Sequence, residues 1–218
     1  MPLKRLQWAM TASNSIPDLI YCDDALVVVN KPAGLLAVPG RGEDKQDCLS
    51  ARLQQEFPDA LVVHRLDMAT SGLMVFARGV EIQRRLSNMF RDRKVEKHYV
   101  AVVAGKLQPE TGEVNLPIAA DWPNRPLRKI DAELGKPSLT RYRVVGQDGD
   151  TTRVELEPVT GRTHQLRVHM SAIGHPILGD ALYGDATSAP RLLLHASSLS
   201  FLHPMSGDSL NFNNLPPF

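Results

Sequence analysis

The chain has 218 residues, of which 43% are hydrophobic and 22% are charged, and its formal net charge is +1. This composition is typical of a globular protein that folds without disulfide bonds, as one large domain or two joined lobes. No apolar run approaches the length of a membrane span, the N-terminus has no continuous apolar signal segment, and the only cysteines are Cys22 and Cys48. We therefore expect a cytoplasmic protein with reduced thiols and no membrane partner.

The charges are unevenly distributed along the chain. Residues 78–98 carry seven Lys or Arg against three acids, and residues 121–143 carry six against three. Local basic patches on a near-neutral protein favour a partner such as one structured RNA over any polyanion. Solvated helix faces would produce similar counts, so the charge pattern alone leaves both interpretations open.

The N-terminal part of the chain is expected to contain an arm followed by a strand pair. Residues 1–18 are mixed and polar, and they predict an arm without an assigned function. Apolar runs at residues 19–21 and 25–29 predict two strands, and Asn-Lys-Pro-Ala-Gly at residues 30–34 predicts the turn that follows.

Two helices are predicted, one before and one after the polar loop at residues 64–72. Residues 39–47 are glycine-rich and charged and predict a surface loop in which Arg41 meets a phosphate. Asp47 is expected to cap a helix whose apolar positions are Leu49, Leu53 and Phe57. The second helix is predicted by four apolar residues at helical spacing, namely Ile82, Leu86, Met89 and Phe90.

The most informative stretch is the polar loop His-Arg-Leu-Asp-Met-Ala-Thr-Ser-Gly at residues 64–72. Apolar runs at residues 60–63 and 73–77 predict a buried strand on each side of it. Loops that are held between rigid strands commonly carry function. A polar turn in which Asp67 bonds to nearby backbone fits the same residues. The spacing alone does not decide between these interpretations.

A second informative stretch is Thr-Gly-Arg-Thr-His-Gln-Leu-Arg-Val-His-Met at residues 160–170. Thr163 is expected to cap a helix that runs to Gly174. His164 and Arg167 are three residues apart, so they would be neighbours near the start of that helix. Free N–H groups and partial positive charge at a helix start suit a carboxylate or a phosphate.

The remainder of the chain is rich in predicted strands. Tyr99 begins one of them, and a lone Tyr in that position is usually part of the core. Residues 121–137 are broken by prolines and predict a long loop. The predicted strands cover residues 99–103, 140–145, 152–156, 192–196, 199–202 and 209–212. Periodicity alone therefore predicts only an α+β fold.

No metal or cofactor is expected. His164 and His169 are five residues apart, which separates them by about 140° around a helix, so they cannot share a ligand face. Cys22 and Cys48 do not form a C-x-x-C pair, and the sequence contains no Walker-type or G-x-G-x-x-G nucleotide motif.

Three motifs together suggest a family. N-K-P-x-G at residues 30–34, H-R-L-D-x-x-T-S-G at residues 64–72 and T-G-R-x-H-Q-L-R at residues 160–167 resemble, in this order, the signatures of the RluA-type pseudouridine synthases. The resemblance implies an α+β pseudouridine synthase fold, with a mixed, mostly antiparallel central sheet flanked by helices, and two lobes around a cleft. It also implies one catalytic domain over residues 19–218 without an appended RNA-binding domain.

The resemblance implies a role for several residues. Asp67 would be the catalytic residue, Arg167 its charged partner, and Tyr99 the ring that stacks on the target base. Arg65 is our candidate to fill the gap that a flipped-out base leaves in the RNA. The other expected RNA contacts are Arg41, Arg125, Arg128, Arg162 and His164.

The implied reaction detaches uracil from C1′ of a uridine in RNA, turns it, and rejoins it through C5. Residues 121–136 resemble the small dual-specificity subfamily, so the expected substrates are a 23S rRNA hairpin and a tRNA anticodon stem-loop. We expect a monomer with no obligate protein partner. Two alternatives are a glycosidase that uses the same Asp, although such enzymes normally pair two carboxylates, and a non-catalytic RNA-binding module.

Overall fold

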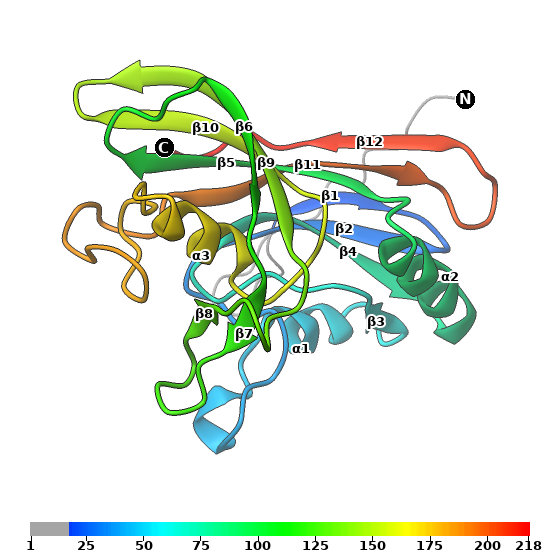
Figure 1. Cartoon of the computed structure of the whole chain (residues 1–218). Coiled ribbons are helices and arrows are strands. Elements are labelled where there is room, and N and C mark those ends of the chain that lie inside the picture. Colours follow the sequence, from blue (N-terminus) through cyan, green and yellow to red (C-terminus); the bar gives the residue numbers. More distant parts are fainter. Residues whose placement is uncertain (1–17) are drawn as a thin grey trace.

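The computed structural model describes residues 18–218, so the predicted arm at residues 1–18 lies outside it except for its last residue. Figure 1 shows a broad sheet with helices packed beside it. Among the described residues, no helix is long and apolar enough to cross a membrane. The elements are β1 (Leu19–Cys22), β2 (Leu26–Lys31), the 3-10 helix η1 (Glu43–Lys45), α1 (Leu49–Gln54), β3 (Ala60–Val62), β4 (Ser71–Arg78), α2 (Val80–Arg91), β5 (Glu96–Ala104), β6 (Thr111–Asn115), β7 (Ile118–Ala120), β8 (Arg128–Ile130), β9 (Leu139–Asp148), β10 (Thr151–Pro158), α3 (Gln165–Ala172), β11 (Leu194–Leu202) and β12 (Ser209–Asn213).

One 10-stranded sheet dominates the described residues. Its main order is β1-β2-β4-β11-β5-β10-β9-β6, with β12 paired to β11 and β3 paired to β4. Within this sheet β4 and β11 are parallel, whereas the other neighbouring strands are antiparallel. The expected α+β fold with a mixed, mostly antiparallel sheet is therefore confirmed.

The two faces of the sheet hold different helices because side chains alternate along a strand. On one face, Val27 of β2 belongs to a core cluster with Leu49 of α1. On the other face, the next residue, Val28, belongs to a cluster with Leu86 of α2. Helix α3 completes the core, where its Met170 packs in a third cluster with strands β5 and β10.

The register of β11 joins two halves of the sheet that are distant in sequence. Ala196 of β11 is paired with Gly72 on β4 and with Tyr99 on β5. Gly72 lies just after the polar loop that connects β3 to β4. Strand β11 therefore brings this loop and Tyr99 to the same place on the sheet.

The three predicted helices exist as α1, α2 and α3, but the two predicted caps, Asp47 and Thr163, are wrong. Helix α1 has Cys48 at its N-cap without a side-chain capping bond, and Asp47 instead forms an ion pair with Arg52 at 2.7 Å. Helix α3 starts at Gln165 with His164 at its N-cap, and Thr163 does not cap it. The Gln165 side chain accepts the Arg162 N–H at 3.0 Å, so that donor is satisfied from inside the helix.

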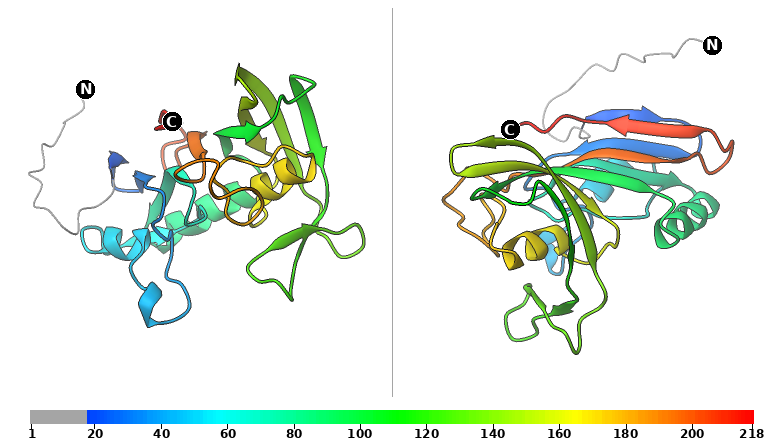
Figure 2. Two further views of the ribbon diagram at one scale, coloured as in Figure 1. Left: turned by 90° about the vertical axis from the view of Figure 1, so that its left-hand side faces the viewer. Right: turned by 45° about the horizontal axis from the view of Figure 1, so that its top comes forward.

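The sequence predicted one long loop over residues 121–137, and this prediction is wrong. Strands β7 and β8 pair as a separate two-stranded sheet, and only residues 121–127 form the turn between them. Each strand has three residues, which is too short for an alternating pattern to stand out. This β7–β8 hairpin extends away from the main sheet at the bottom of the right-hand view in Figure 2.

We predict that Gly72→Ala strongly destabilises the fold. Gly72 has φ +117°, and a Cβ there would overlap the backbone of Ala196 on β11. We expect the free energy of unfolding, measured by urea denaturation, to fall by more than about 3 kcal/mol. Gly207→Ala is the control, because Gly207 has φ +79° with nothing near its Cβ position; it should cost about 1 kcal/mol. Equal losses in the two variants would contradict this account of the β4–β11 contact.

Candidate active site

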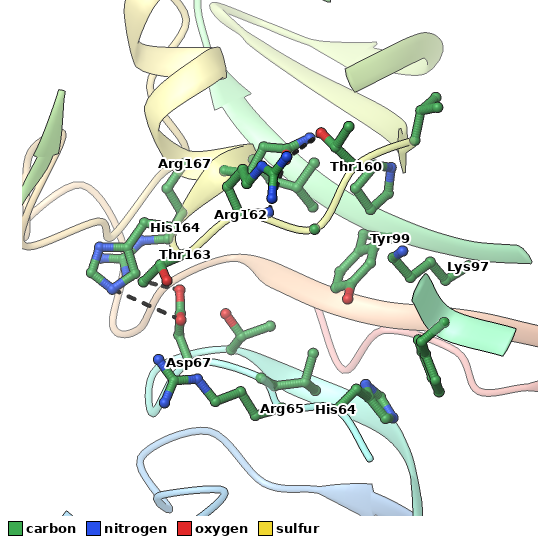
Figure 3. A pocket seen from close by; sticks show the side chains of 18 of the residues that line it. His64, Arg65, Asp67, Lys97, Tyr99, Thr160, Arg162, Thr163, His164 and Arg167 are labelled. Atoms are coloured by element: carbon green, nitrogen blue, oxygen red, sulfur yellow. Dashed lines mark hydrogen bonds and ion pairs between the residues drawn. The ribbon is translucent and has the colours of Figure 1, made fainter. Parts of the chain in front are cut away.

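A cavity of about 540 Å³ lies where the loop between β3 and β4 faces the segment that leads into α3. Figure 3 shows side chains from both segments pointing into it, with Tyr99 of β5 at its side. Within residues 18–218, six cationic side chains and one acid, Asp67, line the cavity. The cations are Arg65, Arg91, Arg93, Lys97, Arg162 and Arg167. This excess of positive charge suits a polyanionic ligand.

Asp67 and Arg167 meet inside this cavity although 100 positions separate them in the sequence. Arg167 donates a hydrogen bond from Nη1 to Asp67 Oδ2 at 3.3 Å. The Arg167 side chain is 5% exposed and that of Asp67 is 24% exposed. The carboxylate is therefore accessible from the cavity, whereas its partner is built into the core.

Asp180 fixes the position of Arg167 from the opposite side. It is fully buried and accepts hydrogen bonds from Arg167 Nε at 2.8 Å and from Arg167 Nη2 at 2.6 Å. Burial alone would raise the pKa of Asp180, but the hydrogen bonds and charge of Arg167, with the N–H groups of Leu182 and Tyr183, hold it below its usual value. Because Asp180 uses Nε and Nη2, the Nη1 group of Arg167 is left for Asp67.

His164 lies close to Asp67 without a hydrogen bond to it. Its backbone is left-handed, with φ 58°, and its Nε2 lies 3.8 Å from Asp67 Oδ1. The Tyr183 hydroxyl lies 2.6 Å from His164 Nδ1 and also accepts the Arg128 N–H at 2.9 Å. Burial lowers the pKa of His164, which favours the neutral ring. The imidazole of His164 is thus held beside Asp67 by its hydrogen bond to Tyr183.

Lys31 anchors the loop that carries Asp67. Its side chain is fully buried, and its Nζ donates to the carbonyl oxygens of Pro32 and Leu35 at 2.8 Å and of Met68 at 3.1 Å. The Gly34 N–H also donates to the Met68 carbonyl, at 2.8 Å. Burial lowers the pKa of Lys31 to about 8, although Asp67 acts in the opposite direction. The first motif therefore holds the residue that follows Asp67.

Tyr99 and His64 line the same cavity. Burial, and next the charge of Asp67, raise the pKa of Tyr99, so its hydroxyl stays protonated. His64 stacks on Phe90 with ring centroids 4.6 Å apart, and its Nε2 accepts the Val75 N–H at 3.0 Å. Burial, and next Lys97, lower the pKa of His64 to about 3. His64 thus supports the wall of the cavity as a neutral ring.

The structure places the other predicted RNA contacts in two groups. Arg65 and His164 line both this cavity and a second cavity of about 380 Å³. Of the two, Arg65 is exposed. Arg41, Arg125 and Arg128 line only the second cavity. Arg162 lines the first cavity and lies 3.3 Å from the Pro137 carbonyl. The roles of these residues remain predictions.

The sequence reasoning missed Asp180, Tyr183 and the tether formed by Lys31. A signal was present for Asp180, because it is a single acid after the apolar stretch Pro-Ile-Leu-Gly at residues 176–179. Tyr183 carried no comparable signal. Within residues 18–218, no group of three or more His, Cys, Asp or Glu is placed to hold a metal ion.

Comparison with known proteins places this site in a family. The family profile described as RNA pseudouridylate synthase matches residues 25–172. The dual-specificity RNA pseudouridine synthase RluA of Escherichia coli is 52% identical over 198 residues, covering 89% of this chain and 90% of that protein. The protein of the same description from Pasteurella multocida is 48% identical over 205 residues, covering 92% and 94%.

A solved structure agrees with the sequence comparisons. Human RNA pseudouridylate synthase domain containing 1 superposes with a TM-score of 0.78 at 30% identity, covering 96% of this chain and 87% of that one. The fold, the profile and the relatives point to the same class of protein, an RNA-modifying isomerase. The chain belongs to the RNA pseudouridylate synthase family.

We predict that Asp180→Asn both unfolds the protein more readily and slows its reaction. The amide leaves Arg167 without its buried counter-charge, and the loss of one partner of a buried pair costs about 3–5 kcal/mol. Urea denaturation should detect that loss. Asp185→Asn is the matched control, because Asp185 is exposed and accepts hydrogen bonds from Thr187 rather than from Arg167. Equal stabilities of the two variants would show that Asp180 does not hold Arg167.

We also predict that His64 makes the fold sensitive to acid. The unfolded chain binds a proton at His64 near pH 6.5, whereas the folded protein does so only near the pKa of about 3. The unfolded state therefore holds more protons between these values, and the free energy of unfolding falls as the pH drops below 6.5. His64→Gln should make this slope shallower in denaturation series from pH 4 to 7. An unchanged slope would contradict a neutral His64 ring in the folded protein.

Proposed function

We propose that this protein converts uridine to pseudouridine in structured RNA, and that it acts on both rRNA and tRNA. The observation that carries the proposal is the single carboxylate of Asp67, held by buried Arg167 in a cavity lined with cations. The reaction breaks the C1′–N1 bond of the nucleoside, forms a C1′–C5 bond, and releases the hydrogen of C5 as a proton, while N1 takes up a proton in exchange. It needs no oxidant, reductant or phosphate donor.

In this proposal, Asp67 acts as the ionised carboxylate. Three roles fit it: attack on C1′, addition to C6 of the ring, or removal of the 2′ hydrogen. Each role requires the negative charge, and Arg167 stabilises that charge with a charge-assisted hydrogen bond.

The target base has to leave the RNA stack to reach Asp67, at a cost of about a few kcal/mol. Tyr99 lines the same cavity as Asp67 and offers its ring to the flipped uracil. Stacking of a base on an aromatic ring contributes about 1–3 kcal/mol, which offsets much of that cost. Arg65 is exposed at the rim and is our candidate to fill the gap in the RNA.

The alternatives are less well supported by the same site. A glycosidase normally uses two carboxylates about 5–10 Å apart around one substrate. Among residues 18–218, Asp67 is the one acid that lines the cavity, and Asp180 is fully buried behind Arg167. A non-catalytic RNA-binding module would not need an accessible carboxylate, which repels phosphate, at the centre of a cationic cavity.

The substrates in this proposal are a hairpin of 23S rRNA and a tRNA anticodon stem-loop. Two relatives that cover about nine-tenths of the chain are described as dual-specificity RNA pseudouridine synthases, which supports this choice. Folded single-stranded loops can be read by shape and by a few splayed bases. We propose that residues 19–218 act as one catalytic domain, in a monomer, in the cytoplasm where these RNAs are found.

We predict that Asp67→Asn abolishes the reaction and leaves RNA binding intact. The amide preserves the shape of the side chain and removes its charge, so tritium release from stem-loop RNA with 5-tritiated uridine should fall by at least about 10³-fold. Filter binding of the same RNA should change less than about threefold. Asp24→Asn makes the same chemical change at an exposed residue outside the cavity and should react normally. Release of tritium at the wild-type rate by Asp67→Asn would disprove the proposed function.

A further inference from the structure

The second cavity, of about 380 Å³, adjoins the first one and is not needed to hold the target base. The two cavities share three lining residues, Arg65, Thr163 and His164. The other walls come from the loop that holds Arg41 and from the β7–β8 hairpin. Figure 2 shows the segment around η1 and this hairpin extending from the sheet toward the same side. A ligand in the first cavity could thus continue directly into the second.

The charge of the second cavity suits phosphate. Arg41, Arg65, Arg125 and Arg128 line it, and none of the other lining residues within residues 18–218 is an acid. Nε of Arg128 is buried and has no hydrogen-bond partner among the described residues. Four guanidinium groups without a facing acid favour an anionic ligand in this cavity.

An aromatic platform lies beside these cations. Trp122 is 68% exposed, and the Arg125 guanidinium lies 3.7 Å from the centroid of its ring. A stacked guanidinium and indole present flat faces, on which any nucleobase can stack. An exposed indole at the rim of a cavity is typical of a binding site rather than of a core.

The platform is held in place by its surroundings. Asp121 donates its N–H to Leu127 O at 3.1 Å and accepts from the Asn124 side chain at 3.0 Å, which closes the turn. The Arg128 N–H donates to the Tyr183 hydroxyl, which also contacts His164. The hairpin is therefore connected to the residues around Asp67 by hydrogen bonds, so the platform is positioned before RNA binds.

We propose that the second cavity binds one further nucleotide of the same RNA loop, unstacked and close to the target uridine in the RNA chain. Its base stacks on the Trp122–Arg125 pair, and its phosphate is held by Arg41 and Arg128. This inference rests on the proposed function, because it assigns part of the substrate to a site next to Asp67. The volume of the cavity lies within the range of about 300–1,000 Å³ that is usual for small ligands.

A fluorescence titration tests the inference directly. The chain contains two tryptophans, Trp8 and Trp122, so a Trp8→Phe variant leaves Trp122 as the single indole. Stem-loop RNA should quench its emission on binding, because a base stacks on the ring. In a series of RNAs with one abasic loop position each, the quench should disappear for one position other than the target uridine. A quench that survives every abasic substitution, or no quench with RNA bound, would overturn the proposal.

A kinetic comparison provides an independent test. Trp122→Ala should lower kcat/KM for tritium release by about 10- to 100-fold, and Trp122→Phe should restore it to within about threefold of wild type. Leu134→Ala is the control, because Leu134 is another exposed apolar residue and does not line the cavity. If Trp122→Ala matched Leu134→Ala, the subsite would be wrong. If the wild-type protein released no tritium, the proposed function would fail instead, and the titration would still report on the subsite.

Discussion

The division of the Arg167 guanidinium between two carboxylates determines the geometry of the site. Asp180 takes Nε and Nη2 inside the core, and Asp67 takes Nη1 at the wall of the cavity. With one acid only, the same carboxylate would have to hold the buried arginine and also react. Two acids in different surroundings divide the roles of anchor and reactant. Asp180 is fully buried and can only hold the arginine, so the partly exposed Asp67 is the carboxylate available for chemistry.

The rest of the fold serves to bring these groups together. Strand β11 is parallel to β4 and antiparallel to β5, and its Ala196 is adjacent to both Gly72 and Tyr99. This register sets the loop of Asp67 beside the aromatic ring proposed to hold the base. Lys31 holds the loop by a hydrogen bond to the Met68 carbonyl. Helix α3 presents Arg167 from the opposite side of the cavity. Segments from across the chain thus converge on one carboxylate.

The sequence was sufficient to predict most strands of the main sheet, the helix at residues 80–91 and the family, but it missed the strands β6, β7 and β8. It was not sufficient for contacts that depend on tertiary structure. The Asp67 and Arg167 pair came from motif resemblance, since no local pattern relates residues 100 positions apart. Asp180 stands out as a single acid after an apolar stretch, but that pattern does not indicate its partner, Arg167. The cap assigned to Thr163 was wrong because the helix begins one residue later, after a left-handed His164, and the Gln165 N–H donates to the Arg162 carbonyl instead.

The central claim is that Asp67, oriented by Arg167, acts on a uridine flipped into the cavity beside Tyr99. The most direct test is a crystal structure of the wild-type protein with a stem-loop RNA whose target is 5-fluorouridine, because fluorine at C5 cannot leave as a proton and should stop the reaction. We expect the fluorinated ring inside the cavity, against Tyr99, with an Asp67 oxygen bonded to or in contact with the nucleoside. A target ring that stays stacked in the RNA, or one that lies in the cavity out of reach of Asp67, would contradict the account.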